Sequence, residues 1–91
     1  MPAYEVIIRG RVQGVGYRAF TQASAHSLGV TGWVRNEPEG SVRALLQHSD
    51  PAAVEQFMRL LAQGPAAAAV KGIEISIIDE HQPQAGFEIL P

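Results

Sequence analysis

Residues 10–18 read Gly10-Arg11-Val12-Gln13-Gly14-Val15-Gly16-Tyr17-Arg18. They connect an alternating apolar run at residues 4–10, typical of a strand, with a helical pattern at residues 18–28. Three glycines within seven residues let the backbone turn sharply and approach a ligand closely. The N–H groups at a helix start are unpaired and carry partial positive charge, and Arg18 adds a guanidinium. The segment therefore predicts a socket for a tetrahedral oxyanion such as phosphate.

The composition is that of one small globular domain. The chain has 91 residues, of which 46% are hydrophobic and 18% charged, so we expect a single domain over residues 1–91. It has no cysteine, which excludes disulfides, thiol nucleophiles and thiolate metal sites. The formal net charge of −2 argues against a protein that binds nucleic acid.

The sequence carries no signal for a membrane or an oligomer. The apolar runs are too short to span a bilayer. The segment Met1-Pro2-Ala3-Tyr4-Glu5 lacks the basic start and apolar core of a signal peptide. We therefore expect a cytoplasmic monomer that does not associate with membranes.

The rest of the chain alternates between strand and helix patterns. A second helix is predicted from Asp50-Pro51, an N-cap residue followed by proline, to the stop at Gly64-Pro65. The turn Glu37-Pro38-Glu39-Gly40 joins two strands into a hairpin. The further strands are predicted at residues 30–36, 41–47, 70–78 and 86–90.

This order predicts an α+β fold of the ferredoxin-like type. It is a two-layer sandwich, β-α-β-β-α-β plus a short C-terminal strand, with two helices on one face of an antiparallel sheet. The strands at 4–10 and 30–36 should be parallel, with another strand between them. Arg18 and Asn36 then lie near the same edge of the sheet.

Several segments together resemble the acylphosphatase family. They are Gly10 to Arg18 as quoted above, Ala25-x-x-Leu28-Gly29-Val30-Thr31-Gly32-Trp33-Val34-Arg35-Asn36, and Glu39-Gly40-Ser41-Val42, with weaker agreement at Gly64-Pro65-Ala66 and Phe87-Glu88-Ile89. The resemblance extends over essentially the whole chain. It implies a ferredoxin-like fold and a hydrolase acting on acid anhydrides, which converts acyl phosphates to carboxylate and inorganic phosphate without a metal.

The resemblance also implies roles for individual residues. Arg18 would bind the phosphate together with backbone N–H groups of the loop, and Asn36 would orient the attacking water. The N–H groups are those of Gln13, Gly14, Val15, Gly16 and Tyr17. No cofactor is implied, and the partners would be a small-molecule acyl phosphate and inorganic phosphate, the product and an inhibitor. Tyr17 stands where phenylalanine is common in the family, and Arg43 where an acidic residue is frequent.

Other polar residues do not suggest a second site. Glu37 and Glu39 lie in the hairpin turn and are expected to be too exposed for a general acid. His26, His48 and His81 are scattered, without the spacing of metal ligands or a catalytic triad.

Each site residue also has a plainer interpretation. The glycine loop alone fits a tight connection, Arg18 alone a solvated cation, and Asn36 alone a turn residue. An anion-binding module on the same fold with little turnover stays open as an alternative. An RNA-binding domain of this fold would need exposed aromatic residues on its middle strands, and no such run is present.

Overall fold

The predicted order of strands and helices is confirmed. The computed structural model describes residues 2–79 and 82–91. Where a helix or strand begins or ends at a different residue from the one expected, the difference is one residue. The elements are β1 (Ala3–Arg11), α1 (Tyr17–Leu28), β2 (Thr31–Asn36), β3 (Val42–Gln47), α2 (Pro51–Gln63), β4 (Ala69–Ile78) and β5 (Phe87–Ile89).

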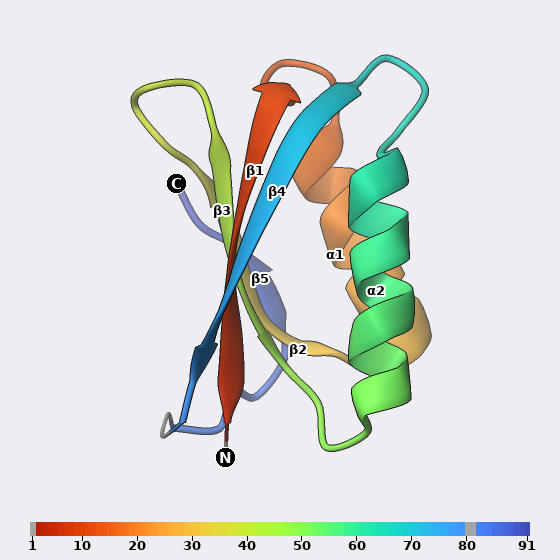
Figure 1. Ribbon diagram of the computed structural model, residues 1–91, viewed down its shortest axis with the longest axis vertical. Helices are drawn as coiled ribbons and strands as arrows, with labels where there is room; N and C mark the ends of the chain where they lie inside the picture. The colour runs from red at the N-terminus through yellow and green to blue at the C-terminus, as the bar shows by residue number, and fades with distance from the viewer. Residues whose placement is uncertain (1, 80–81) are drawn as a thin grey trace.

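The strands form one five-stranded sheet in the order β4-β1-β3-β2-β5, and both helices cover the same face (Figure 1). β3 is antiparallel to both of its neighbours, so β1 and β2 run in the same direction on either side of it. This two-layer arrangement is the predicted ferredoxin-like fold. It brings the ends of β1 and β2 to the same edge of the sheet.

The sheet differs from the prediction at one edge. β5 pairs in parallel with β2, with Gly32 opposite Phe87 and Val34 opposite Ile89, so the sheet is mixed rather than antiparallel throughout. The reason is the connection that precedes β5. β4 is antiparallel to β1, and the chain then crosses to the opposite edge before β5 starts. β5 therefore runs in the direction of β1 and β2.

Both helices begin and end on local sequence signals. The side chain of Asp50 accepts a hydrogen bond from the N–H of Ala52 at 2.9 Å, which caps the start of α2 ahead of Pro51. α1 ends at Gly29, which is left-handed with φ of 69°. The apolar stripe of α2 is buried through Val54, Phe57 and Leu61.

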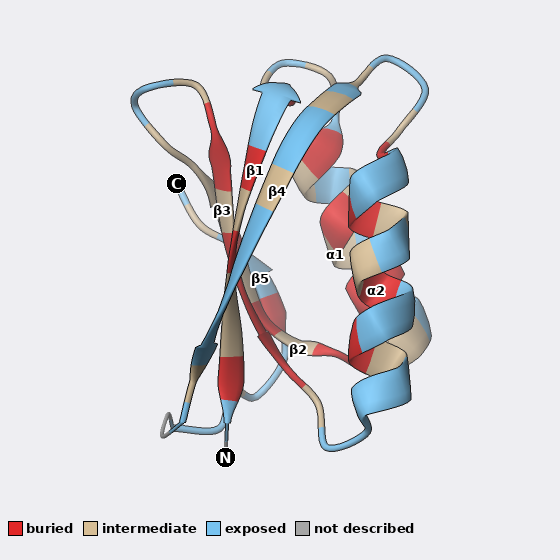
Figure 2. Cartoon of the chain, in the orientation of Figure 1, coloured by how far each residue is buried: buried red, intermediate tan, exposed pale blue. Residues whose placement is uncertain are grey.

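The core lies between the sheet and the two helices, and β4 is largely exposed (Figure 2). β2 approaches β3 closely at Gly32, where φ is 142° and an added Cβ would lie 1.8 Å from the Leu45 carbonyl oxygen. Only glycine fits there. Among the described helices, none is long and apolar enough to cross a membrane.

Candidate active site

A cavity of about 230 Å³ opens where β1 ends and α1 begins. It is lined by residues of the loop, the first turn of α1, the end of β2 and β5. The lining residues are Val12, Gly14, Gly16, Tyr17, Arg18, Ala19, Asn36 and Ile89. The structure therefore brings Arg18 and Asn36 to one cavity, as the parallel arrangement of β1 and β2 predicts.

The loop reaches this geometry through two left-handed glycines. Gly14 has φ of 73° and Gly16, the N-cap residue of α1, has φ of 78°. A side chain at either position would be strained. Gly16 has no side chain to cap the helix, and the first turn holds no acidic residue. The earliest helical bond joins the Phe20 N–H to the Gly16 carbonyl at 3.0 Å.

The N–H groups of Tyr17, Arg18 and Ala19 precede that bond and have no partner within the helix. All three residues line the cavity. Unpaired N–H groups at a helix start, with their partial positive charge, are a binding site for an anion.

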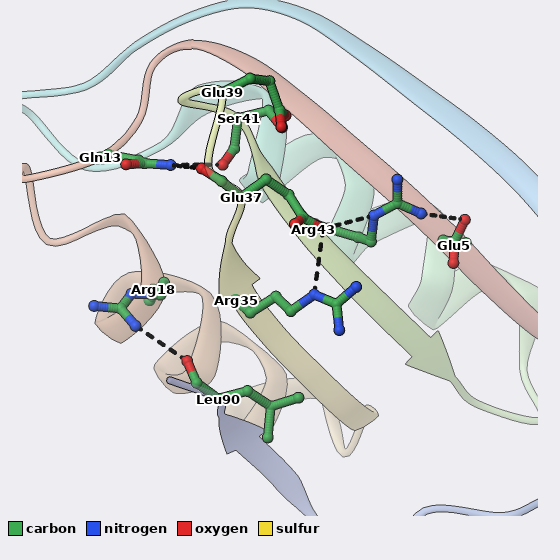
Figure 3. Close-up of polar contacts among 9 residues, drawn as sticks. All are labelled: Glu5, Gln13, Arg18, Arg35, Glu37, Glu39, Ser41, Arg43 and Leu90. Atoms are coloured by element: carbon green, nitrogen blue, oxygen red, sulfur yellow. Dashed lines mark hydrogen bonds and ion pairs between the residues drawn. The ribbon is translucent and has the colours of Figure 1, made fainter.

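Arg18 is held at the cavity by the C-terminal segment. Its Nη1 donates a hydrogen bond to the backbone carbonyl of Leu90 at 3.2 Å (Figure 3). The Leu90 N–H in turn donates to the Val34 carbonyl at 2.8 Å, which ties this segment to β2. A cation at the positive end of a helix is unfavourable in itself. A bound anion would relieve this conflict.

Asn36 is the last residue of β2, paired with Val42 of β3. Its Oδ1 atom is buried and accepts no hydrogen bond in the described part of the chain. A buried acceptor without a donor costs free energy. The Asn36 amide oxygen therefore keeps an unused capacity to accept a hydrogen bond beside the cavity.

The structure does not bring every predicted loop residue to the cavity lining. The side chain of Gln13 turns toward the β2–β3 hairpin, where its Nε2 donates to the carbonyls of Glu37 and Ser41. Val15 packs against the hydrophobic core. The predicted backbone roles of residues 13–17, like the roles of Arg18 and Asn36, stay predictions.

Tyr17 connects the loop with α2, a contact that the sequence did not reveal. Its side chain is 1% exposed, and its hydroxyl donates to the Leu61 carbonyl at 2.6 Å. Four residues after Leu61 stands Pro65, which has no N–H to donate to that carbonyl. Burial raises the pKa of the Tyr17 phenol above its usual range.

The expectation that Glu37 is exposed is wrong. Its side chain is only 16% exposed, and its carboxylate accepts from Arg35 Nε at 3.2 Å and Arg43 Nε at 2.9 Å. Arg43 also bonds Glu5 on β1 at 2.7 Å (Figure 3). This alternating chain of charges explains why arginine fits at position 43.

Glu39 accepts from the Ser41 hydroxyl, and this hydrogen bond lowers the pKa of the Glu39 carboxyl.

The remaining titratable candidates lie away from the cavity. His26 and His48 are not among its lining residues, and His81 lies outside the described residues. In residues 2–79 and 82–91, no three histidine, aspartate or glutamate side chains gather in a way that could hold a metal ion.

We expect Tyr17→Phe to lower the free energy of unfolding by about 1 kcal/mol, because the buried Leu61 carbonyl loses its donor while the ring keeps its packing. Urea denaturation measures this change. Tyr4→Phe is the matched control, since the Tyr4 hydroxyl makes no hydrogen bond with any described residue. Equal stability of the two variants would contradict the role assigned to the Tyr17 hydroxyl.

Known proteins share both this sequence and this fold. A sequence model of the acylphosphatase family matches residues 4–89. An acylphosphatase from Rhizobium etli is 48% identical over 87 residues, covering 96% of this chain and 92% of that protein. One from Methanocella arvoryzae is 44% identical over 89 residues, covering 98% and 99%. The crystal structure of acylphosphatase from Bacillus subtilis superposes with a TM-score of 0.95 at 31% identity, covering all of both chains. The match along nearly the whole chain, in sequence and in fold, means that this chain belongs to the acylphosphatase family.

Proposed function

We propose that this acylphosphatase hydrolyses the carboxyl–phosphate bond of acyl phosphates with Arg18 and Asn36 as its catalytic residues. The phosphoryl group would bind at the start of α1, where Arg18 and the backbone N–H groups of residues 13–17 neutralise it. A water molecule held by Asn36 would attack the phosphorus. The observation that carries this proposal is the shared cavity, in which an anion site lies beside a buried, unpartnered amide oxygen.

The chemistry of the substrate suits so simple a site. The leaving group is a carboxylate, whose conjugate acid has a pKa of roughly 4, so it departs without a general acid. Phosphoryl transfer passes through a loose transition state and depends mainly on positioning and charge stabilisation. The guanidinium of Arg18 is always charged and offers several donors in a fixed plane. Together with backbone N–H groups it can stabilise the transferred group without a metal.

Asn36 supplies orientation rather than basicity. A side-chain amide is not a base, but its oxygen accepts a hydrogen bond from water and directs a lone pair of that water toward the phosphorus. The proton lost by the water would pass to an oxygen of the phosphate itself.

The direct test is hydrolysis of benzoyl phosphate by the purified protein with a chelator present. We expect turnover that the chelator does not reduce, together with competitive inhibition by inorganic phosphate. Absence of turnover would contradict the proposed reaction. Turnover that requires added metal would contradict the proposed mechanism.

We also expect kcat/KM to show no enzyme-derived step between about pH 6 and 8. The titratable side chains that line the cavity are Arg18 and Tyr17, and burial moves the pKa of Tyr17 further above this window. Tyr17 therefore stays neutral throughout, and an arginine guanidinium is always charged in proteins. A steep dependence on an enzyme group near neutrality would instead indicate a general base that this cavity does not provide.

A further inference from the structure

The loop at residues 12–16 follows β1, whereas Asn36 lies on β2. The sheet does not join these two strands directly, because β3 lies between them. β1 pairs with β3 only as far as Ile8, which lies opposite Val42. From Arg9 onward β1 pairs with β4 alone. Asn36 lies one strand further on, at the end of β2. The sheet therefore fixes the position of Asn36. The loop at residues 12–16, which follows β1, has to be positioned by other contacts.

The side chain of Gln13 makes the missing connection. Its Nε2 donates to the Glu37 carbonyl at 2.8 Å and the Ser41 carbonyl at 2.9 Å, so both amide protons are used (Figure 3). The same two carbonyls close the hairpin turn, because Gly40 N–H donates to Glu37 and Glu37 N–H donates to Ser41. Among the hydrogen bonds of the described residues, only the two from Gln13 join residues 12–16 to the hairpin.

The turn that receives Gln13 is itself held in place. Glu37 directly follows Asn36, and its carboxylate is bound by Arg35 and Arg43. Arg43 extends the link to Glu5 on β1. The side chain of Gln13 is thus hydrogen-bonded to a turn that ion pairs hold in place, and this turn begins one residue after Asn36.

We propose that the side chain of Gln13 is a positioning residue that sets the separation between the phosphate-binding loop and Asn36. This inference rests on the proposed function, in which the loop holds the phosphorus and Asn36 holds the water. In the proposed function, phosphate binding depends on Arg18 and backbone N–H groups of the loop, not on the side-chain amide of Gln13. Loss of the amide should therefore impair the alignment of water and phosphorus much more than the binding of phosphate.

The first test compares Gln13→Met with Gln22→Met. Gln22 lies on α1 outside the cavity lining, and its Nε2 makes a similar bond, to the Phe87 carbonyl at 3.0 Å. We expect Gln13→Met to lower kcat for benzoyl phosphate by about 10- to 100-fold, as small misplacements of reacting groups do. The inhibition constant of inorganic phosphate should change by less than about threefold. Gln22→Met should keep the wild-type kcat.

A second variant tests the hydrogen bonds without changing the shape of the side chain. In Gln13→Glu a carboxylate faces two carbonyl oxygens, offers no donor and repels them. Protonation restores one donor, and the two oxygens raise the pKa of the new carboxyl. We therefore expect the activity relative to wild type to rise as the pH falls from 7 to 5. If the activity of Gln13→Glu relative to wild type did not change with pH, the hydrogen bonds of Gln13 would not be the cause of the effect.

The outcomes separate this inference from the proposed function. A kcat of Gln13→Met within twofold of wild type overturns the inference, and so does an equal loss of kcat and phosphate binding. If the wild type itself does not hydrolyse benzoyl phosphate, the proposed function fails and NMR decides the inference. Asn36 is the sole asparagine, so its side-chain amide can be followed. Movement of that signal in Gln13→Met but not in Gln22→Met supports the link between loop and Asn36, and an unmoved signal refutes it.

Discussion

Replacing Arg18 with alanine is expected to lower kcat/KM for benzoyl phosphate by about a thousandfold or more, the effect typical of an arginine that stabilises a transferred phosphoryl group. Arg18 reaches the cavity from the first turn of α1 and is the sole cationic residue among those that line it. Its loss leaves the backbone N–H groups, which bind phosphate weakly without a full positive charge. We therefore expect the inhibition constant of inorganic phosphate to rise together with the loss of activity.

The activity loss should not come from unfolding. Among the described residues, the side chain of Arg18 makes one hydrogen bond, to the Leu90 carbonyl, and its charge is unfavourable at a helix start. Without phosphate, the free energy of unfolding of Arg18→Ala should stay within about 1 kcal/mol of wild type. Phosphate should raise the melting temperature of wild type but not of Arg18→Ala, since only a ligand that binds the folded state stabilises it.

Two further variants sharpen the test of Arg18. Arg18→Lys keeps the charge but not the planar set of donors, so its activity should lie between those of wild type and Arg18→Ala. Arg59→Ala is the control, because Arg59 is exposed on α2 and, among the residues that the structure describes, pairs only with Glu55 at 3.0 Å. An Arg18→Ala variant that keeps wild-type phosphate inhibition would contradict the assignment of Arg18 as the phosphate ligand.

The sequence was sufficient to predict how Arg18 and Asn36 meet. Strand alternation, the cap at Asp50 and the glycines at helix ends are local signals, and local structure follows them. Once the order of elements is known, a crossover through α1 makes β1 and β2 parallel in one sheet and brings their ends to the same edge. The central geometry of the site therefore follows from a few short patterns.

The contacts that steady the site could not be predicted in this way. The carbonyl of Leu90 that holds Arg18 is 72 residues away, and its position depends on β5 pairing in parallel with β2. Glu37 stands beside a proline in a turn, which favours exposure, yet two arginines from neighbouring strands enclose it. Such pairings depend on which strands are neighbours and on side-chain directions across them.

β4 shows the same limit for the core. Its alternation places Ile75 opposite Val6 and Ile77 opposite Tyr4, on the face that the helices cover elsewhere. Ile75 and Ile77 are nevertheless 49% and 67% exposed. β4 is an edge strand, so it has a neighbour on one side only. An alternating pattern identifies a face but not how far the other layer extends over it.

The complementary experiment is Asn36→Ala, which should separate catalysis from binding. We expect kcat to fall by about 100- to 1,000-fold, the cost typical of removing one well-placed hydrogen-bonding group from an active site. The inhibition constant of inorganic phosphate should change little, because the Asn36 amide is proposed to hold the water and not the phosphate. Thr31→Val, at the other end of the same strand, is the control and should keep wild-type kcat.

Stability offers a second measure of the role of Asn36. Its buried Oδ1 has no partner among the described residues, so removing the amide removes an unsatisfied polar atom from the fold. Asn36→Ala should therefore be as stable as wild type or more stable, by up to about 1 kcal/mol in urea denaturation. A residue kept for packing or for a turn would show the opposite sign. Reduced stability together with a parallel loss of phosphate binding would mean that Asn36 shapes the loop rather than the path of the water. We expect lower kcat, unchanged inhibition by phosphate and undiminished stability. Together these results would mean that Asn36 does not stabilise the fold and acts on the reaction instead.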